Sequence, residues 1–64
     1  MIEGDYVRHR AAPDLGLLEI VRVEHWDQTV LVVRDATGEY DPRHTFKVKA
    51  GEAFQVPAPN QLVS

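Results

Sequence analysis

Cysteine is absent from this 64-residue chain. Its absence excludes disulfide bonds and every metal site that needs a thiolate ligand, and it fits a reducing compartment. A chain of this length buries only about 60% of the surface that its unfolded form exposes. We therefore expect one domain, residues 1–64, with a narrow stability margin that a homo-oligomer would widen.

Long apolar runs are also missing, since the longest covers only residues 30–33. A helix that crosses a bilayer needs roughly 20 apolar residues. The first residues show neither the basic segment nor the apolar segment of a secretory signal. The sequence therefore predicts a soluble, cytoplasmic protein with no membrane partner.

Positive charge is scarce, with seven Lys and Arg against ten Asp and Glu and a net charge of −3. Domains that bind nucleic acid are usually basic overall. The balance of charge therefore favours a protein or peptide partner, although nucleic acid stays a possible one.

Short bursts of β-branched and aromatic residues alternate with turn residues along the whole chain, which is typical of an all-β domain. No segment has the 3.6-residue apolar period of a helix. We predict a small five-stranded barrel with a strongly bent antiparallel sheet. The predicted strands cover residues 5–10, 17–25, 29–34, 44–49 and 53–56, with an extended segment at 39–43 and room for one helical turn in the tail 57–64.

Two local patterns predict how the strands bend and pair. Leu18 and Ile20 share one face of the second strand, whereas Val21 and Val23 share the other. An apolar set that changes face within one strand indicates a bulge or a strong bend near Ile20 and Val21. Residues 35–38 have the Asp and Gly of a tight turn, so the strands on either side should pair as a hairpin.

The segment 4–8 reads Gly-Asp-Tyr-Val-Arg, and it is followed by Gly16, the long bent strand 17–23 and the apolar strand 30–33. In this order the pattern resembles the SH3-like barrel group in its broad sense, which includes Tudor-like and KOW-like domains. The resemblance implies a bacterial-type barrel that binds another macromolecule as a small adaptor.

A second resemblance involves residues 54–56, which read Phe-Gln-Val. They are similar to the Val-Gln-Ile of the pore strand in the plasmid-borne type II dihydrofolate reductases, which are tetramers of short SH3-like barrels. Pro57 stands where that family has Tyr. This resemblance implies a third hypothesis, an oligomeric reductase-like enzyme that uses NADPH and folate.

The residues themselves indicate no catalysis and no cofactor. His9, His25 and His44 are far apart in the sequence, without the short spacing that metal-binding histidines usually show. No nucleophile stands in a recognisable arrangement with a base. We predict a non-catalytic protein without a metal, and whether the three histidines converge depends on the fold.

Aromatic side chains are the candidate ligand-binding residues. In SH3-like barrels, loop aromatics often line the ligand groove, which implies this role for Trp26 and Tyr40. The hypothesis of a protein or peptide partner adds Tyr6 of the first predicted strand, with nearby acids. For Trp26 a second interpretation stays open, in which the indole covers one end of the barrel. Phe46 and Phe54 are expected in the core.

The arginines carry the nucleic-acid alternative. Four of them fall on neighbouring predicted strands: Arg8, Arg10, Arg22 and Arg34. If they align across the sheet, they form a cationic stripe able to contact phosphates. The other interpretation is that they pair with Glu19, Glu24 or Asp35, which gives a neutral solvated face.

Overall fold

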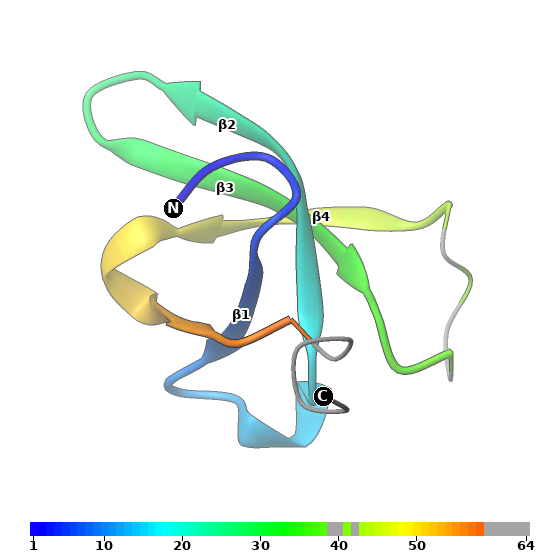
Figure 1. Ribbon diagram of the computed structural model, residues 1–64. Coiled ribbons are helices and arrows are strands. Elements are labelled where there is room, and N and C mark those ends of the chain that lie inside the picture. The colour runs from blue at the N-terminus through cyan, green and yellow to red at the C-terminus, as the bar shows by residue number, and fades with distance from the viewer. Residues whose placement is uncertain (39–40, 42, 59–64) are drawn as a thin grey trace.

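The computed structural model describes residues 1–38, 41 and 43–58, which form short strands and two single 3-10 turns (Figure 1). The elements are β1 (Tyr6–His9), η1 (Pro13–Leu15), β2 (Leu18–His25), β3 (Thr29–Asp35), β4 (Thr45–Lys49), η2 (Ala50–Glu52) and β5 (Ala53–Val56). All five predicted strands are confirmed, with ends within one residue of the prediction. Within these residues no helix has the length and apolar character needed to cross a membrane.

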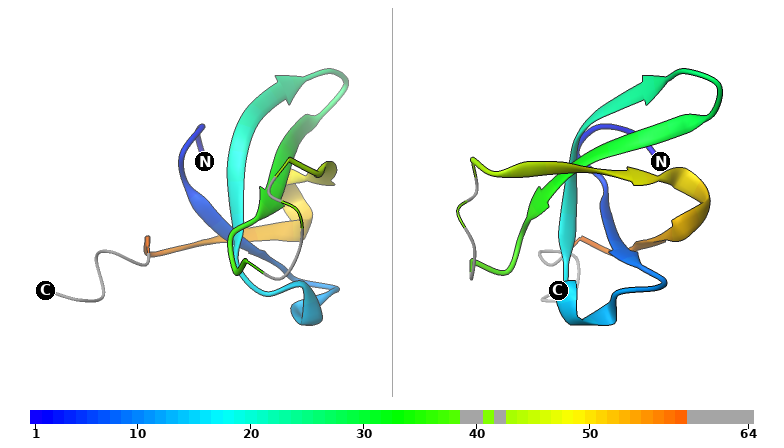
Figure 2. Two further views of the ribbon diagram at one scale, coloured as in Figure 1. Left: turned by 90° about the vertical axis from the view of Figure 1, so that its right-hand side faces the viewer. Right: turned by 180° about the vertical axis from the view of Figure 1, so that it is seen from behind.

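The five strands form one antiparallel sheet in the order β4-β3-β2-β1-β5. The sheet is curled but not closed, so β4 and β5 are its two edges (Figures 1 and 2). These edge strands are joined by η2, the corner between the yellow and orange segments of Figure 1. The prediction of an all-β, five-stranded fold is confirmed.

The bend of β2 arises from a bulge. The register of β2 against β3 shifts between Ile20 and Arg22, which leaves Val21 as the extra residue. One extra residue reverses the alternation of side chains between the two faces. As a result Leu18 and Ile20 before the bulge and Val23 after it pack on the same core. The predicted bulge is confirmed.

The hydrophobic core lies inside the curl of the sheet. Its members are aliphatic side chains from every strand: Val7, Leu18, Ile20, Leu31, Val33, Val48 and Ala53. Phe46 is half-buried and packs against this cluster, as the sequence predicted. Because β3 lies between two strands, it supplies two of the fully buried side chains, Leu31 and Val33.

The prediction that Phe54 belongs to the core is wrong. Its side chain is 38% exposed, and the register of β5 against β1 places it opposite the exposed Arg8. The guanidinium of Arg10 lies over the ring, 5.6 Å from its centroid. Alternation along β5 therefore turns the small side chain of Ala53 inward instead.

The predicted pairing of β3 with β4 is confirmed, with Leu31 opposite Val48. The turn that follows β3 is held by Asp35, whose carboxylate accepts hydrogen bonds from the backbone N–H of Thr37 at 3.2 Å and from its hydroxyl at 2.7 Å. This is the side-chain bond to nearby backbone that Asp favours in turns.

Other predictions lie partly outside the described residues. The extended segment predicted at 39–43 includes positions 39, 40 and 42. The helical turn predicted in the tail includes positions 59–64.

Gly16 lets the loop after β1 approach the turn after β3. Its φ is +71°, a conformation that side chains disfavour, and a Cβ at this position would lie 3.0 Å from Cγ2 of Thr37. The N–H of Ala36 bonds to the carbonyl of Leu17 at 2.9 Å, which holds this loop beside the end of β3 and places Leu15 at the mouth of the curled sheet.

Candidate functional site

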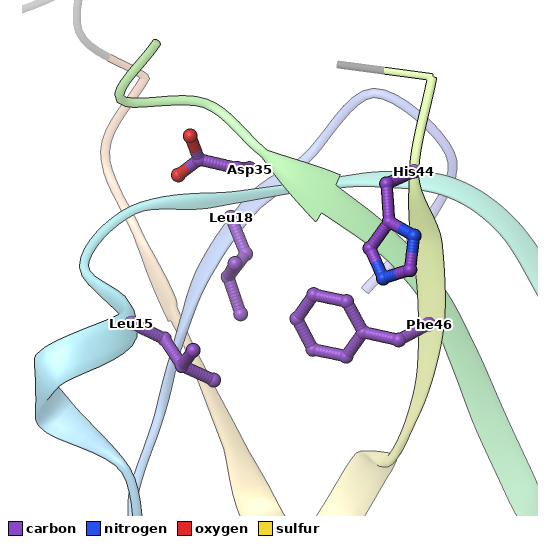
Figure 3. A pocket seen from close by; sticks show the side chains of 5 residues that line it. All are labelled: Leu15, Leu18, Asp35, His44 and Phe46. Atoms are coloured by element: carbon purple, nitrogen blue, oxygen red, sulfur yellow. The ribbon is translucent and has the colours of Figure 1, made fainter. Parts of the chain in front are cut away.

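A pocket of about 370 Å³ lies at this mouth of the curled sheet (Figure 3). Four separate segments line it: η1, the start of β2, the end of β3, and the start of β4 with the residue before it. The lining side chains are Leu15, Leu18, Asp35, His44 and Phe46.

The floor and one wall of the pocket are apolar. In η1 the N–H of Leu15 bonds to the carbonyl of Ala12 at 3.0 Å, and this turn directs Leu15 over the core. Leu18 is buried and Phe46 is half-buried. Figure 3 shows the side chains of Leu15, Leu18 and Phe46 directed toward one space. A hydrophobic side chain of a ligand would find apolar contacts on several sides.

Two polar groups stand at the rim. Asp35 is only 8% exposed, and its register opposite Leu18 places it at this end of the sheet. His44 is exposed, and its ring lies 6.5 Å from the ring of Phe46 at an angle of 33°. The carboxylate of Asp35 is engaged by Thr37, so the imidazole of His44 is the polar group of this lining that can orient a bound segment by hydrogen bonds.

Trp26 lies far from this pocket, at the turn between β2 and β3. Its side chain is 74% exposed, so the interpretation that it covers one end of the barrel is wrong. The indole is nevertheless held in place, because Nε1 donates a hydrogen bond of 3.2 Å to Glu24. The same carboxylate lies 3.1 Å from Nε of Arg22 and 3.2 Å from Nζ of Lys47. The bond from Trp26, followed by that from Lys47, keeps the pKa of Glu24 below its ordinary value of 4.5.

Tyr6 and Trp26 do not form one site. Tyr6 is half-buried on β1, between Glu19 of β2 and Val56 of β5. It lines a shallow hollow with the residues around β5, and Trp26 is not part of that hollow. Tyr40 lies outside the described residues.

The pocket residues were missed because each one has an ordinary structural explanation in the sequence. Leu18 and Phe46 belong to strands, Asp35 belongs to a turn, and His44 flanks a strand. The one available signal was Gly16, which marks a loop that folds back sharply enough to carry Leu15 over the core.

The arginines do not form a continuous cationic stripe. Nη2 of Arg34 lies 2.7 Å from Glu19, and Arg22 is bonded to Glu24. These two pairs follow the neutral-face interpretation. Arg10 covers Phe54 at the other edge of the sheet. Phosphate binding by this face would require Arg22 and Arg34 to leave their carboxylates.

The histidines lie at three separate places. Nε2 of His9 is 3.5 Å from Glu52, Nδ1 of His25 is 3.3 Å from the hydroxyl of Thr29, and His44 contacts Phe46. Over residues 1–38, 41 and 43–58, no group of three or more His, Asp and Glu side chains is arranged to hold a metal ion.

Comparison of the chain with protein-family models, curated proteins and solved structures found no match. The resemblance to SH3-like barrels therefore stays a prediction, and the function has to be inferred from the geometry.

Proposed function

We propose that the protein is a small, non-catalytic binding module that recognises a protein or peptide partner. The observation that carries this proposal is the apolar pocket beside Phe46. Binding sites are typically concave and mostly apolar, with a few polar groups that fix orientation. The pocket has this composition, and a volume of about 370 Å³ accommodates one large side chain of a partner segment.

The composition of the pocket supports binding rather than catalysis. Among the described residues its titratable groups are Asp35 and His44, and no serine, threonine, cysteine or lysine of that lining would act as a nucleophile. The lack of cysteine fits a module that works in the cytoplasm.

Selection from a displayed peptide library, followed by calorimetry of the selected peptides, tests the proposal. We expect the selected peptides to share a large apolar residue. Leu15→Ser should weaken their binding about tenfold, because a partner side chain loses part of its apolar contact. His44→Ala should weaken binding less.

His25→Ala is the matched control, because His25 is also exposed but lies at the other end of β2. It should leave the affinity unchanged, and amide NMR spectra should show that all variants fold. Selection of no peptide, or affinity that ignores both Leu15→Ser and His44→Ala, would contradict the proposal.

Two alternatives give different results in simple experiments. A nucleic-acid module that uses Arg8, Arg10, Arg22 and Arg34 would bind an oligonucleotide with an affinity that falls steeply as salt is raised. A reductase-like enzyme would be a tetramer that binds NADPH. A monomer that ignores both ligands would exclude the two together.

A further inference from the structure

Strand β4 presents an unpaired edge next to the pocket. It is hydrogen-bonded to β3 on one side only. Among the described residues, no backbone hydrogen bond joins β4 to any other segment. Its outer row of N–H and C=O groups is therefore available to a further strand, as at any open sheet edge.

The two faces of β4 have different chemistry. Lys47 and Lys49 are exposed on the convex face, whereas Phe46 and Val48 face the core. Phe46 also lines the pocket. Because successive side chains of a strand point to opposite faces, an added strand would alternate between these two environments. One set of its side chains would lie beside the lysines, and the other would lie beside Phe46.

The charge at this edge selects the partner. Lys47 and Lys49 are the only lysines of the chain, and they lie together on a molecule whose net charge is −3. Arg22 adds a further cation on the same face, since it and Lys47 both lie opposite Val32. Both are bonded to Glu24, so these two cations share one carboxylate, and with Lys49 the face keeps an excess of positive charge. A second copy that paired along this edge would bring lysines close to lysines, which is unfavourable. A strand with carboxylates at alternate positions would be attracted.

We propose that the β4 edge binds an extended segment of another protein in which acidic residues alternate with apolar ones. Its backbone continues the sheet, its carboxylates pair with Lys47 and Lys49, and one apolar side chain enters the pocket beside Phe46. This inference rests on the proposed function and adds the chemical class and the backbone conformation of the partner.

The test uses a short acetylated peptide with glutamate at alternate positions and valine or leucine between them. We expect it to bind the intact chain with an affinity that falls as salt is raised. The double variant Lys47→Glu, Lys49→Glu should weaken binding about tenfold or more, because two favourable cross-strand pairs become repulsive. A peptide with lysine in place of glutamate should bind the double variant more tightly than it binds the native chain.

Arg22→Glu is the matched control. It reverses one charge on the same face and removes one bond to Glu24, but it lies on β2 rather than on the edge. Arg22→Glu should weaken binding of the acidic peptide much less than the double variant Lys47→Glu, Lys49→Glu does. A second control peptide is N-methylated at alternate residues, which removes backbone donors and should abolish binding.

The outcomes separate the inference from the proposed function. If Leu15→Ser weakens the library-selected peptides but the lysine variants do not, the pocket binds its partner without strand addition, and the inference is overturned. If the acidic peptide does not bind, or if the methylated peptide binds equally well, the inference is also overturned. If the native chain forms a dimer through β4, the edge is filled by a second copy instead.

Discussion

The two edges of the sheet are protected in different ways. On β5 the exposed ring of Phe54 is covered by the guanidinium of Arg10, and the strand stops just before Pro57. Proline has no N–H to donate and restricts an edge to few hydrogen bonds. On β4 no described residue forms a backbone hydrogen bond to the outer edge, and Thr45, Lys47 and Lys49 are exposed.

This difference decides which edge can accept a partner. Pro57 has no N–H to donate, so pairing of an added strand along β5 would end at Val56. A pair of lysines repels a strand of the same charge but attracts one that carries carboxylates. We infer that β4 accepts a restricted class of segment, whereas β5 offers a short edge that ends at a proline.

The largest expected effect is on the free energy of unfolding. It concerns the phenylalanine of each edge strand, Phe46 on β4 and Phe54 on β5. Phe46→Ala should reduce the free energy of unfolding by about 3 kcal/mol, because the ring packs against the core. Phe54→Ala should cost about 1 kcal/mol, since that ring is partly exposed on the outer face. Urea denaturation followed by circular dichroism measures both values.

If Phe46→Ala is too unstable to be measured, Phe46→Leu replaces it. This variant should lower the free energy of unfolding by about 1 kcal/mol. Equal losses for Phe46→Ala and Phe54→Ala would show that the two edges contribute equally to the core, contrary to the described packing.

The next prediction concerns self-association. Replacing both edge lysines by valine should cause the chain to associate as its concentration rises, because the charge that opposes pairing along β4 is gone. Gln55→Val adds an apolar residue to β5 and should leave the mass unchanged. Light scattering over a range of concentrations makes the comparison, and equal association of both variants would refute the idea that β4 is the more accessible edge.

A smaller effect should appear in the order of Trp26, at the turn between β2 and β3, as the pH is lowered. The carboxylate of Glu24 holds both Trp26 and Lys47, and its pKa lies below 4.5. Because the folded pKa is lowered, the stabilisation is complete above about pH 4.5 and is lost as the pH falls through the folded value. The fluorescence anisotropy of Trp26, the only tryptophan, should fall over that range.

Glu24→Gln should remove this acid transition. Asp41→Asn is the matched control, because the pKa of Asp41 is also lowered, chiefly by the backbone N–H of Arg43, but the indole bonds to Glu24. The control variant should keep the transition. A transition that survives in Glu24→Gln would mean that another group controls Trp26.

The smallest effect is expected at β5. Arg10→Ala should lower the free energy of unfolding by about 0.5 kcal/mol, since a cation over an exposed ring contributes little. Arg10→Lys should retain part of this stabilisation. Urea denaturation measures both, and a loss comparable to that of Phe46→Ala would show that β5 is held mainly by this contact.

The strands and the bulge could be predicted because they depend on local alternation. The change of face between Ile20 and Val21 has one simple geometric explanation, and the turn chemistry of Asp35 is also local. The orientation of β5 could not be predicted in the same way. A four-residue strand gives too short a pattern, and its register against β1 turns Ala53 inward rather than the larger Phe54.

The candidate site depended on contacts between distant segments. Leu15, Leu18 and Phe46 meet only because the loop of η1 folds back over the core, and no spacing in the sequence records that contact. Conversely, Trp26 suggested burial by its size, whereas its turn lies at the tip of a hairpin that extends beyond the core. Local chemistry therefore predicted the framework, and tertiary packing determined the site.

Amide hydrogen exchange, measured by NMR with and without the acidic peptide, tests the central claim most directly. Strand addition to β4 predicts that the outward amides of residues 45–49 become protected when the peptide is bound, while the exchange of residues 53–56 stays unchanged. Protection at β5, or binding without any new protection in β4, would contradict the account.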